Sequence, residues 1–128
     1  MLSDSLVAAT AYEKLERVSR KDYASEALFF RAERLFLTKD FKTSISVIEK
    51  IAGGNGQSNL WNAKALLLLA KNYYALDDSF QAIFVLESII ENFIIYPEIT
   101  EEAKNLLVTY RNSAAEENRS ITQKDNEN

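Results

Sequence analysis

The chain has 128 residues, a length that suits one domain, and its 47% hydrophobic and 27% charged residues are the shares of an ordinary globular protein. The net charge of −4, without a run of Lys and Arg, argues against a nucleic-acid partner, because phosphate binding needs a concentrated basic surface. The chain has no Cys, which excludes disulfides and thiolate metal sites, and no His, which removes the commonest metal ligand and the usual general base. Only three Gly and one Pro are present, and this scarcity favours long helices over a fold rich in strands and turns.

The first predicted element is a single helix, a half-unit over residues 3–20. Its apolar residues have the same spacing as Ile45, Ile48 and Ile51 further along the chain, so it matches the second helix of a two-helix unit. A half-unit leaves apolar side chains near the start of the chain uncovered. Such a surface would favour self-association through this N-terminal helix.

Residues 23–56 are predicted to form one complete two-helix unit. The apolar face of its first helix, at three- and four-residue spacing, consists of Leu28, Ala32, Leu35 and Phe36. A break follows at Lys39-Asp40, where the Asp40 side chain can accept hydrogen bonds from the first free N–H groups of the next helix. The second helix ends in the glycine-rich run Gly53–Gly56, which suits a helix exit.

Residues 59–96 repeat this plan. When the sequence is aligned with itself so that Ala27 matches Ala65, seven positions of the two copies are identical. We call the displacement from Ala27 to Ala65 the repeat interval. The identical pairs are Ala27/Ala65, Ala32/Ala70, Asp40/Asp78, Ile45/Ile83, Val47/Val85, Glu49/Glu87 and Ile51/Ile89. The turn of the second copy falls at Asp77-Asp78, and helical spacing on both sides outweighs the strand preference of its Ile and Val residues.

A terminal helix is predicted over residues 97–114, followed by a disordered polar tail over residues 116–128. Pro97 suits the first turn of a helix. The apolar face of this helix consists of Ile99, Ala103, Leu106, Leu107 and Tyr110. After Ala115 the sequence offers little apolar surface to bury, which predicts a mobile tail behind a helical repeat domain over residues 1–115.

The two units resemble the tetratricopeptide repeat, whose consensus places Trp, Leu, Gly and Tyr in a first helix and Ala, Phe and Pro in a second. The second unit matches with small and apolar residues at these positions: Leu66, Leu69, Ala70, Tyr73, Ala82, Leu86 and Ile89. Leu28 and Leu66 replace the Trp, and the repeat interval exceeds the usual length of about 34 residues. The resemblance implies an all-α fold, with about six antiparallel helices stacked as a short right-handed solenoid.

The segment Tyr73–Ala82 also resembles repeats of long bacterial proteins of the cell envelope. This resemblance implies that the chain is the C-terminal part of a longer bacterial array. It favours an envelope or periplasmic location, where such repeats serve as scaffolds.

In tetratricopeptide arrays the first helices of successive units line a concave groove, where a peptide or helix of another protein binds. Carried over position by position, the resemblance implies a groove of Glu26, Phe29, Glu33, Phe36, Lys64, Leu67, Lys71, Tyr74, Lys104 and Arg111. Its aromatic and apolar members exceed what the contact between paired helices needs, so they would anchor a partner that the charged members select. The alternative is that these side chains pack against each other.

We find no catalytic, metal or cofactor motif and predict a non-catalytic protein–protein interaction module. Gly53–Gly56 lacks the Lys-Ser/Thr that follows in a P-loop, and Asp77-Asp78 lacks the further ligands of a calcium loop. Glu101 and Glu102 are neighbours on a helix, where side chains point about 100° apart and form no acid–base pair.

Two alternatives stay open. One is a structural spacer or self-associating segment of a longer array. The other is a carboxylate-dependent hydrolase or a sugar-binding accessory, and the hydrolase would need two buried carboxylates about 5–10 Å apart. The start of the chain lacks the features of a signal peptide and its apolar runs are too short to span a bilayer, so we expect a soluble protein without direct membrane insertion.

Overall fold

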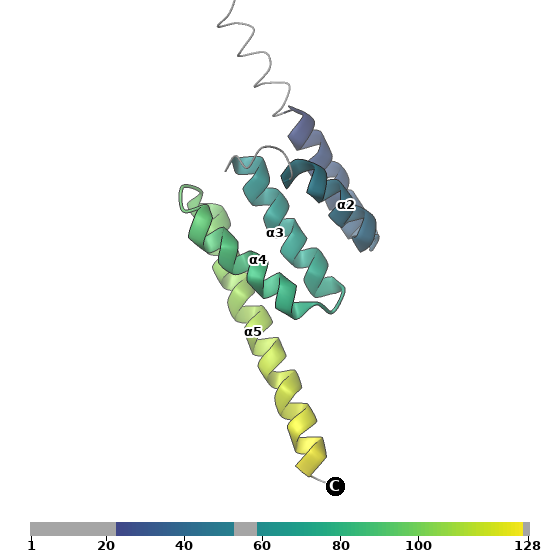
Figure 1. Cartoon of the computed structure of the whole chain (residues 1–128), viewed down its shortest axis with the longest axis vertical. Helices are drawn as coiled ribbons and strands as arrows, with labels where there is room; N and C mark the ends of the chain where they lie inside the picture. Colours follow the sequence, from purple (N-terminus) through teal and green to yellow (C-terminus); the bar gives the residue numbers. More distant parts are fainter. Residues whose placement is uncertain (1–22, 53–58, 127–128) are drawn as a thin grey trace, which may run out of the picture.

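The computed structural model of the chain describes residues 23–52 and 59–126, and all regular structure in these ranges is helical (Figure 1). The described residues form a helix over residues 23–37, then α2 (Phe41–Ala52), α3 (Leu60–Ala75), α4 (Ser79–Asn92) and α5 (Pro97–Asn126). The predicted all-α class is therefore confirmed. The helix predicted over residues 3–20 and the predicted Gly53–Gly56 turn lie outside the described residues.

The turns inside the two predicted units have the same conformation, one repeat interval apart. Lys39 and Asp77 have left-handed backbones, with φ of 66° and 64°. In the first turn the N–H of Asp40 donates to the Leu35 carbonyl at 2.9 Å. In the second, the N–H of Asp78 donates to the Tyr73 carbonyl at 2.8 Å. The repeat seen in the sequence is thus also a repeat of backbone geometry.

Each turn ends in an aspartate that caps the following helix. The Asp40 carboxylate accepts from the N–H of Thr43 at 3.4 Å, and the Asp78 carboxylate accepts from the N–H of Gln81 at 3.1 Å. A side-chain acceptor at this position satisfies an N–H group that has no partner inside the helix. Both second helices, α2 and α4, therefore begin directly after an aspartate, as the sequence predicts.

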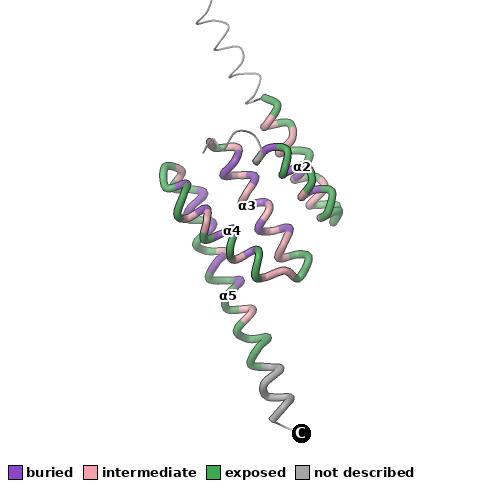
Figure 2. Tube along the Cα trace, in the orientation of Figure 1, coloured by how far each residue is buried: buried purple, intermediate pink, exposed green. Residues whose placement is uncertain are grey.

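The helices bury their apolar faces in two clusters that meet at α3, which packs against α2, α4 and α5. Burial also repeats at the repeat interval. Fully or nearly fully buried pairs are Ala32/Ala70, Ser44/Ala82, Ile48/Leu86 and Ile51/Ile89. The small members let the paired helices approach, while the large members fill the space between them. Figure 2 shows purple, buried stretches on both α3 and α4.

A buried polar contact joins α2 to the helix over residues 23–37 and to α3. The Ser44 hydroxyl donates to the Ala32 carbonyl at 2.8 Å and accepts from the Asn72 side-chain amide at 3.0 Å. The same amide also donates to the Leu68 carbonyl at 3.1 Å. All of these groups are buried, so each hydrogen bond avoids the cost of an unpaired polar atom.

The final helix is longer than predicted. α5 continues to Asn126, past the expected end at residue 114 and through most of the segment 116–128 that the sequence predicts as an unstructured tail. No Gly or Pro follows Pro97, so no residue after it interrupts the backbone hydrogen-bond ladder. The end of α5 projects beyond the other helices, and its described side chains from Ala115 to Arg119 are exposed (Figures 1 and 2).

Candidate functional site

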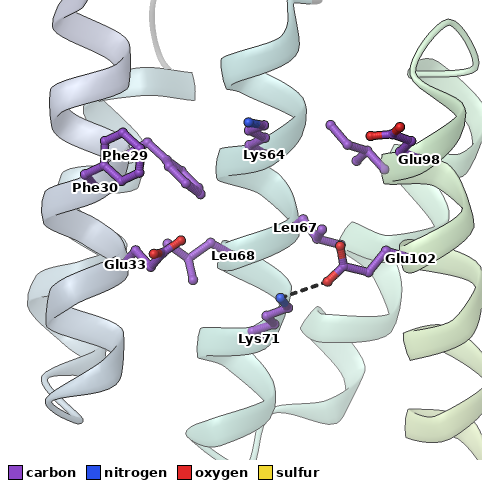
Figure 3. A pocket seen from close by; sticks show the side chains of 10 residues that line it. Phe29, Phe30, Glu33, Lys64, Leu67, Leu68, Lys71, Glu98 and Glu102 are labelled. Atoms are coloured by element: carbon purple, nitrogen blue, oxygen red, sulfur yellow. Dashed lines mark hydrogen bonds and ion pairs between the residues drawn. The ribbon is translucent and has the colours of Figure 1, made fainter.

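A pocket with a volume of about 390 Å³ lies between three helices: the helix over residues 23–37, α3 and α5 (Figure 3). Each of these is the first helix of a predicted unit or the predicted terminal helix. The pocket is lined by Phe29, Phe30, Glu33, Lys64, Leu67, Leu68, Lys71, Glu98, Ile99 and Glu102. Its volume is within the range of about 300–1,000 Å³ that is typical of ligand sites.

The floor of the pocket is apolar and rigidly held. Leu67, Leu68 and Ile99 are nearly buried because they belong to the two core clusters as well as to the pocket. Phe30 is 54% exposed, so a large part of its ring faces water at one wall. A partner would therefore meet the Phe30 ring as the most exposed apolar surface of the pocket.

Aromatic rings support the wall formed by the helix over residues 23–37. The ring centroids of Phe29 and Phe30 lie 5.8 Å apart at an edge-to-face angle. The Trp61 ring lies 5.8 Å from that of Phe29 and 6.4 Å from that of Phe30. Contacts at these distances stabilise an aromatic cluster and fix Phe30 in place despite its exposure.

The charged groups of the pocket come from different helices according to their sign. Lys64 and Lys71 project from the central helix α3, whereas the carboxylates project from the two outer helices (Figure 3). The Lys71 ammonium donates to the Glu102 carboxylate at 3.0 Å. The Lys64 ammonium lies 4.7 Å from the centroid of the Trp61 ring, which is a cation–π contact.

Five of the ten predicted groove residues line this pocket: Phe29, Glu33, Lys64, Leu67 and Lys71. Position by position, the first two units contribute equivalent residues. The members of each pair Phe29/Leu67, Phe30/Leu68 and Glu33/Lys71 are separated by the repeat interval, and all six line the pocket.

The other five predicted groove residues do not line it. Phe36 packs into the core with its ring centroid 5.6 Å from that of Phe41, and Tyr74 stacks on Tyr110 of α5 at 3.8 Å. Arg111 forms an ion pair with Glu87 of α4, outside the pocket. Glu26 is half-buried and Lys104 is exposed, and neither lines the pocket.

The sequence prediction missed Phe30, Leu68, Glu98, Ile99 and Glu102, of which the last three belong to α5. Lys104 and Arg111 were placed on the groove side of α5, but they follow Leu66 and Tyr73 by one repeat interval, and these two residues pack against the core of their own unit. Glu102, by contrast, follows Lys64 by one repeat interval. The repeat interval, applied strictly to α5, would have identified Glu102.

Tyr110 is a buried residue of α5 whose ring stacks on that of Tyr74. Burial raises the pKa of the Tyr110 phenol above its ordinary value of 10.0, and the neighbouring Tyr74 and Glu102 raise it further. The phenol is therefore neutral at physiological pH and contributes packing rather than charge.

The described residues do not form the arrangement that the hydrolase alternative needs. Every Asp and Glu of residues 23–52 and 59–119 is exposed or half-buried, so no pair of buried carboxylates is present in these ranges. Within the same residues, no group of three or more acidic side chains is placed to hold a metal ion. Nor does any helix in the described part of the chain have both the length and the apolar character to cross a bilayer.

Comparisons with protein-family models, with curated proteins and with solved structures return no match for this chain.

Proposed function

We propose that this chain is a tetratricopeptide-like repeat protein that binds a segment of another protein and catalyses no reaction. In this proposal its helices form part of a short right-handed solenoid, whose first helices bind an extended peptide or a helix in the pocket described above. The bound segment would lie on the apolar floor, between the helix over residues 23–37 and α5.

One observation carries the proposal. The pocket is lined by repeat-equivalent positions of successive first helices, including Phe29 with Leu67 and Glu33 with Lys71. A helix pair that stacks at a constant interval presents the same face repeatedly, and concave surfaces of this origin are the usual binding surfaces of repeat proteins. The exposed Phe30 ring at one wall of this surface is the type of side chain that anchors a partner.

The alternatives of internal packing and of a structural spacer also have support, from Phe36 and Tyr74. Both side chains contact other aromatic rings of the chain, at Phe41 and Tyr110. These two residues therefore belong to the scaffold, and the binding proposal does not depend on them.

A site-specific crosslinking experiment tests the proposal. Phe30 is replaced by a photoreactive phenylalanine analogue in one variant, and Phe84 in a control variant. Phe84 is 66% exposed on α4 and does not line the pocket. We expect Phe30 variants to crosslink to a discrete protein of the source cell and Phe84 variants not to do so. Crosslinks of equal yield from both positions, or from neither, would favour the spacer.

A further inference from the structure

We infer that the segment bound in this pocket is basic as well as apolar: a large apolar side chain rests on the floor, and Lys or Arg residues on either side of it face Glu33 and Glu98. This inference rests on the proposed function and deepens it, because it states the chemistry of the partner.

Two carboxylates of the pocket have no ion pair among the described residues. Its lining contains three carboxylates and two ammonium groups. Lys71 is already paired with Glu102 at 3.0 Å, and the Lys64 ammonium lies over the Trp61 ring. Among the described residues neither Glu33 nor Glu98 has an ion pair. Within the described part of the chain, the pocket therefore presents two carboxylates without an ion pair. The cation–π contact leaves the Lys64 charge in place, so two ammonium groups and three carboxylates give the lining a net charge of −1.

These two carboxylates lie on opposite walls of the pocket. Glu33 belongs to the helix over residues 23–37 and Glu98 to α5, so they stand on opposite walls with the leucines of α3 between them (Figure 3). A segment that enters the pocket has to pass between the two walls. Cationic side chains on both sides of an apolar one would meet a carboxylate at each wall while the apolar side chain covers Phe30 and the floor.

The same carboxylates disfavour an acidic segment. An acidic segment would bring its carboxylates next to Glu33 or Glu98, and like charges in an interface oppose binding. Its only cationic partners in the pocket lining would be Lys64 and Lys71, and the latter would first have to leave Glu102. The pocket is thus selective for a basic segment over an acidic one.

The chain contains a built-in reporter for this test. Trp61 is its only tryptophan, and its ring contacts Phe29, Phe30 and the Lys64 ammonium, all of which line the pocket. We would titrate the chain with short synthetic peptides and follow Trp61 fluorescence. One peptide combines Leu with Lys, the second has the same Leu residues with Glu in place of Lys, and the third has Lys but Ala in place of Leu.

The Leu–Lys peptide is expected to bind at least about tenfold more tightly than either of the other two. Only this peptide can both cover the apolar floor and pair with the carboxylates of the two walls. Its affinity should fall when the salt concentration is raised from about 0.05 M to about 0.5 M, since exposed charge pairs are screened. Equal affinities of the Leu–Lys and Leu–Glu peptides, or no binding of the Leu–Lys peptide, would overturn the inference.

Matched variants show whether binding occurs in the pocket. Glu33→Gln and Glu98→Gln should each lower the affinity for the Leu–Lys peptide by about threefold. Glu91→Gln and Glu116→Gln make the same charge change outside the pocket and should leave this affinity unchanged. Phe30→Ala should also weaken binding, while Phe84→Ala should not. Equal effects of the two sets, with unchanged thermal unfolding, would show non-specific binding and overturn the inference.

The two proposals can fail separately. If the Leu–Glu peptide binds more tightly and Phe30→Ala weakens it, the pocket still binds protein segments and only the basic character of the partner is wrong. If no peptide changes Trp61 fluorescence and Phe30 also fails to crosslink in cell extract, both proposals are wrong.

Discussion

Replacing Ser44 by Ala tests the buried polar contact that joins α2 to the helix over residues 23–37 and to α3. The substitution removes a hydrogen bond to the Ala32 carbonyl and one from the Asn72 amide, while that amide keeps its bond to Leu68. Each buried hydrogen bond contributes about 0.5–1.5 kcal/mol, so the loss amounts to about 1–3 kcal/mol. Ala has the higher helix propensity, which offsets about 0.5 kcal/mol of this loss. We therefore expect Ser44→Ala to lower the free energy of unfolding by about 0.5–2.5 kcal/mol.

The assay is urea and thermal unfolding followed by circular dichroism at the helical minimum. A change of this size lowers the Tm of a domain of this length by about 2–15 °C. Ser46→Ala is the matched control, because Ser46 belongs to the same helix but its hydroxyl bonds the Lys42 carbonyl at the exposed surface. The control is expected to change stability by less than about 0.5 kcal/mol. If Ser44→Ala costs no more than Ser46→Ala, the buried contact does not stabilise the fold as argued.

Four further predictions concern stability and the ends of the structure. Ile48→Ala and Leu86→Ala should each cost about 2–5 kcal/mol in chemical denaturation, because both side chains are fully buried at equivalent positions; a difference of more than about 3 kcal/mol between them would contradict equivalent packing. Lys39→Gly should raise the free energy of unfolding by about 0.5 kcal/mol or more, since Lys39 has a φ of 66° that glycine adopts without strain; a loss of stability would show that the turn is not strained. Because the pKa of Tyr110 is raised, the folded chain retains the phenol proton at pH values where the unfolded chain has lost it. The contribution of this group to the free energy of unfolding is therefore fully present below pH 10.0 and is lost as the pH rises above that value. Tyr110→Phe should reduce this loss in alkaline unfolding curves, and an unchanged pH slope would refute the assignment. Deleting residues 116–128 should reduce helical ellipticity but leave the midpoint of denaturation unchanged, because the described side chains of this segment are exposed; a lowered midpoint would show that the end of α5 packs on the domain.

The helical class and the positions of the turns could be predicted from the sequence because they depend on local chemistry. Asp40 and Asp78 are good helix caps, and the apolar spacing around them continues at intervals of three and four residues. The repeat interval also identified which small residues would be buried, since Ala32 and Ala70 are both completely covered.

The end of α5 was harder to predict because two rules disagree. Composition after Ala115 is polar and indicates a tail, whereas the absence of Gly and Pro allows the helix to continue. Without Gly or Pro the backbone hydrogen-bond ladder continues, and the exposed side chains from Ala115 to Arg119 show that the helix there extends past the core. The structure follows the second rule as far as Asn126.

The candidate site was only half predicted, because periodicity does not decide which aromatic residues face the core. Phe36 and Phe30 belong to the same helix, yet Phe36 packs on Phe41 and Phe30 faces the pocket. The difference depends on neighbours from α2 and α3, which sequence spacing does not reveal. For α5, the repeat interval leads from Lys64 to Glu102 but from Leu67 to Asn105, which does not line the pocket, so the interval alone does not give the missed residues.

The most direct test of the binding proposal is hydrogen–deuterium exchange of the chain, with and without the protein that crosslinks to Phe30. The account predicts slower amide exchange in three segments that are distant in sequence: the helix over residues 23–37, residues 64–71 of α3 and the start of α5. Exchange in α4 should stay unchanged, since none of its residues lines the pocket. Slower exchange in α4 alone, or no change in any of the three segments, would contradict the proposal that these helices bind a partner together.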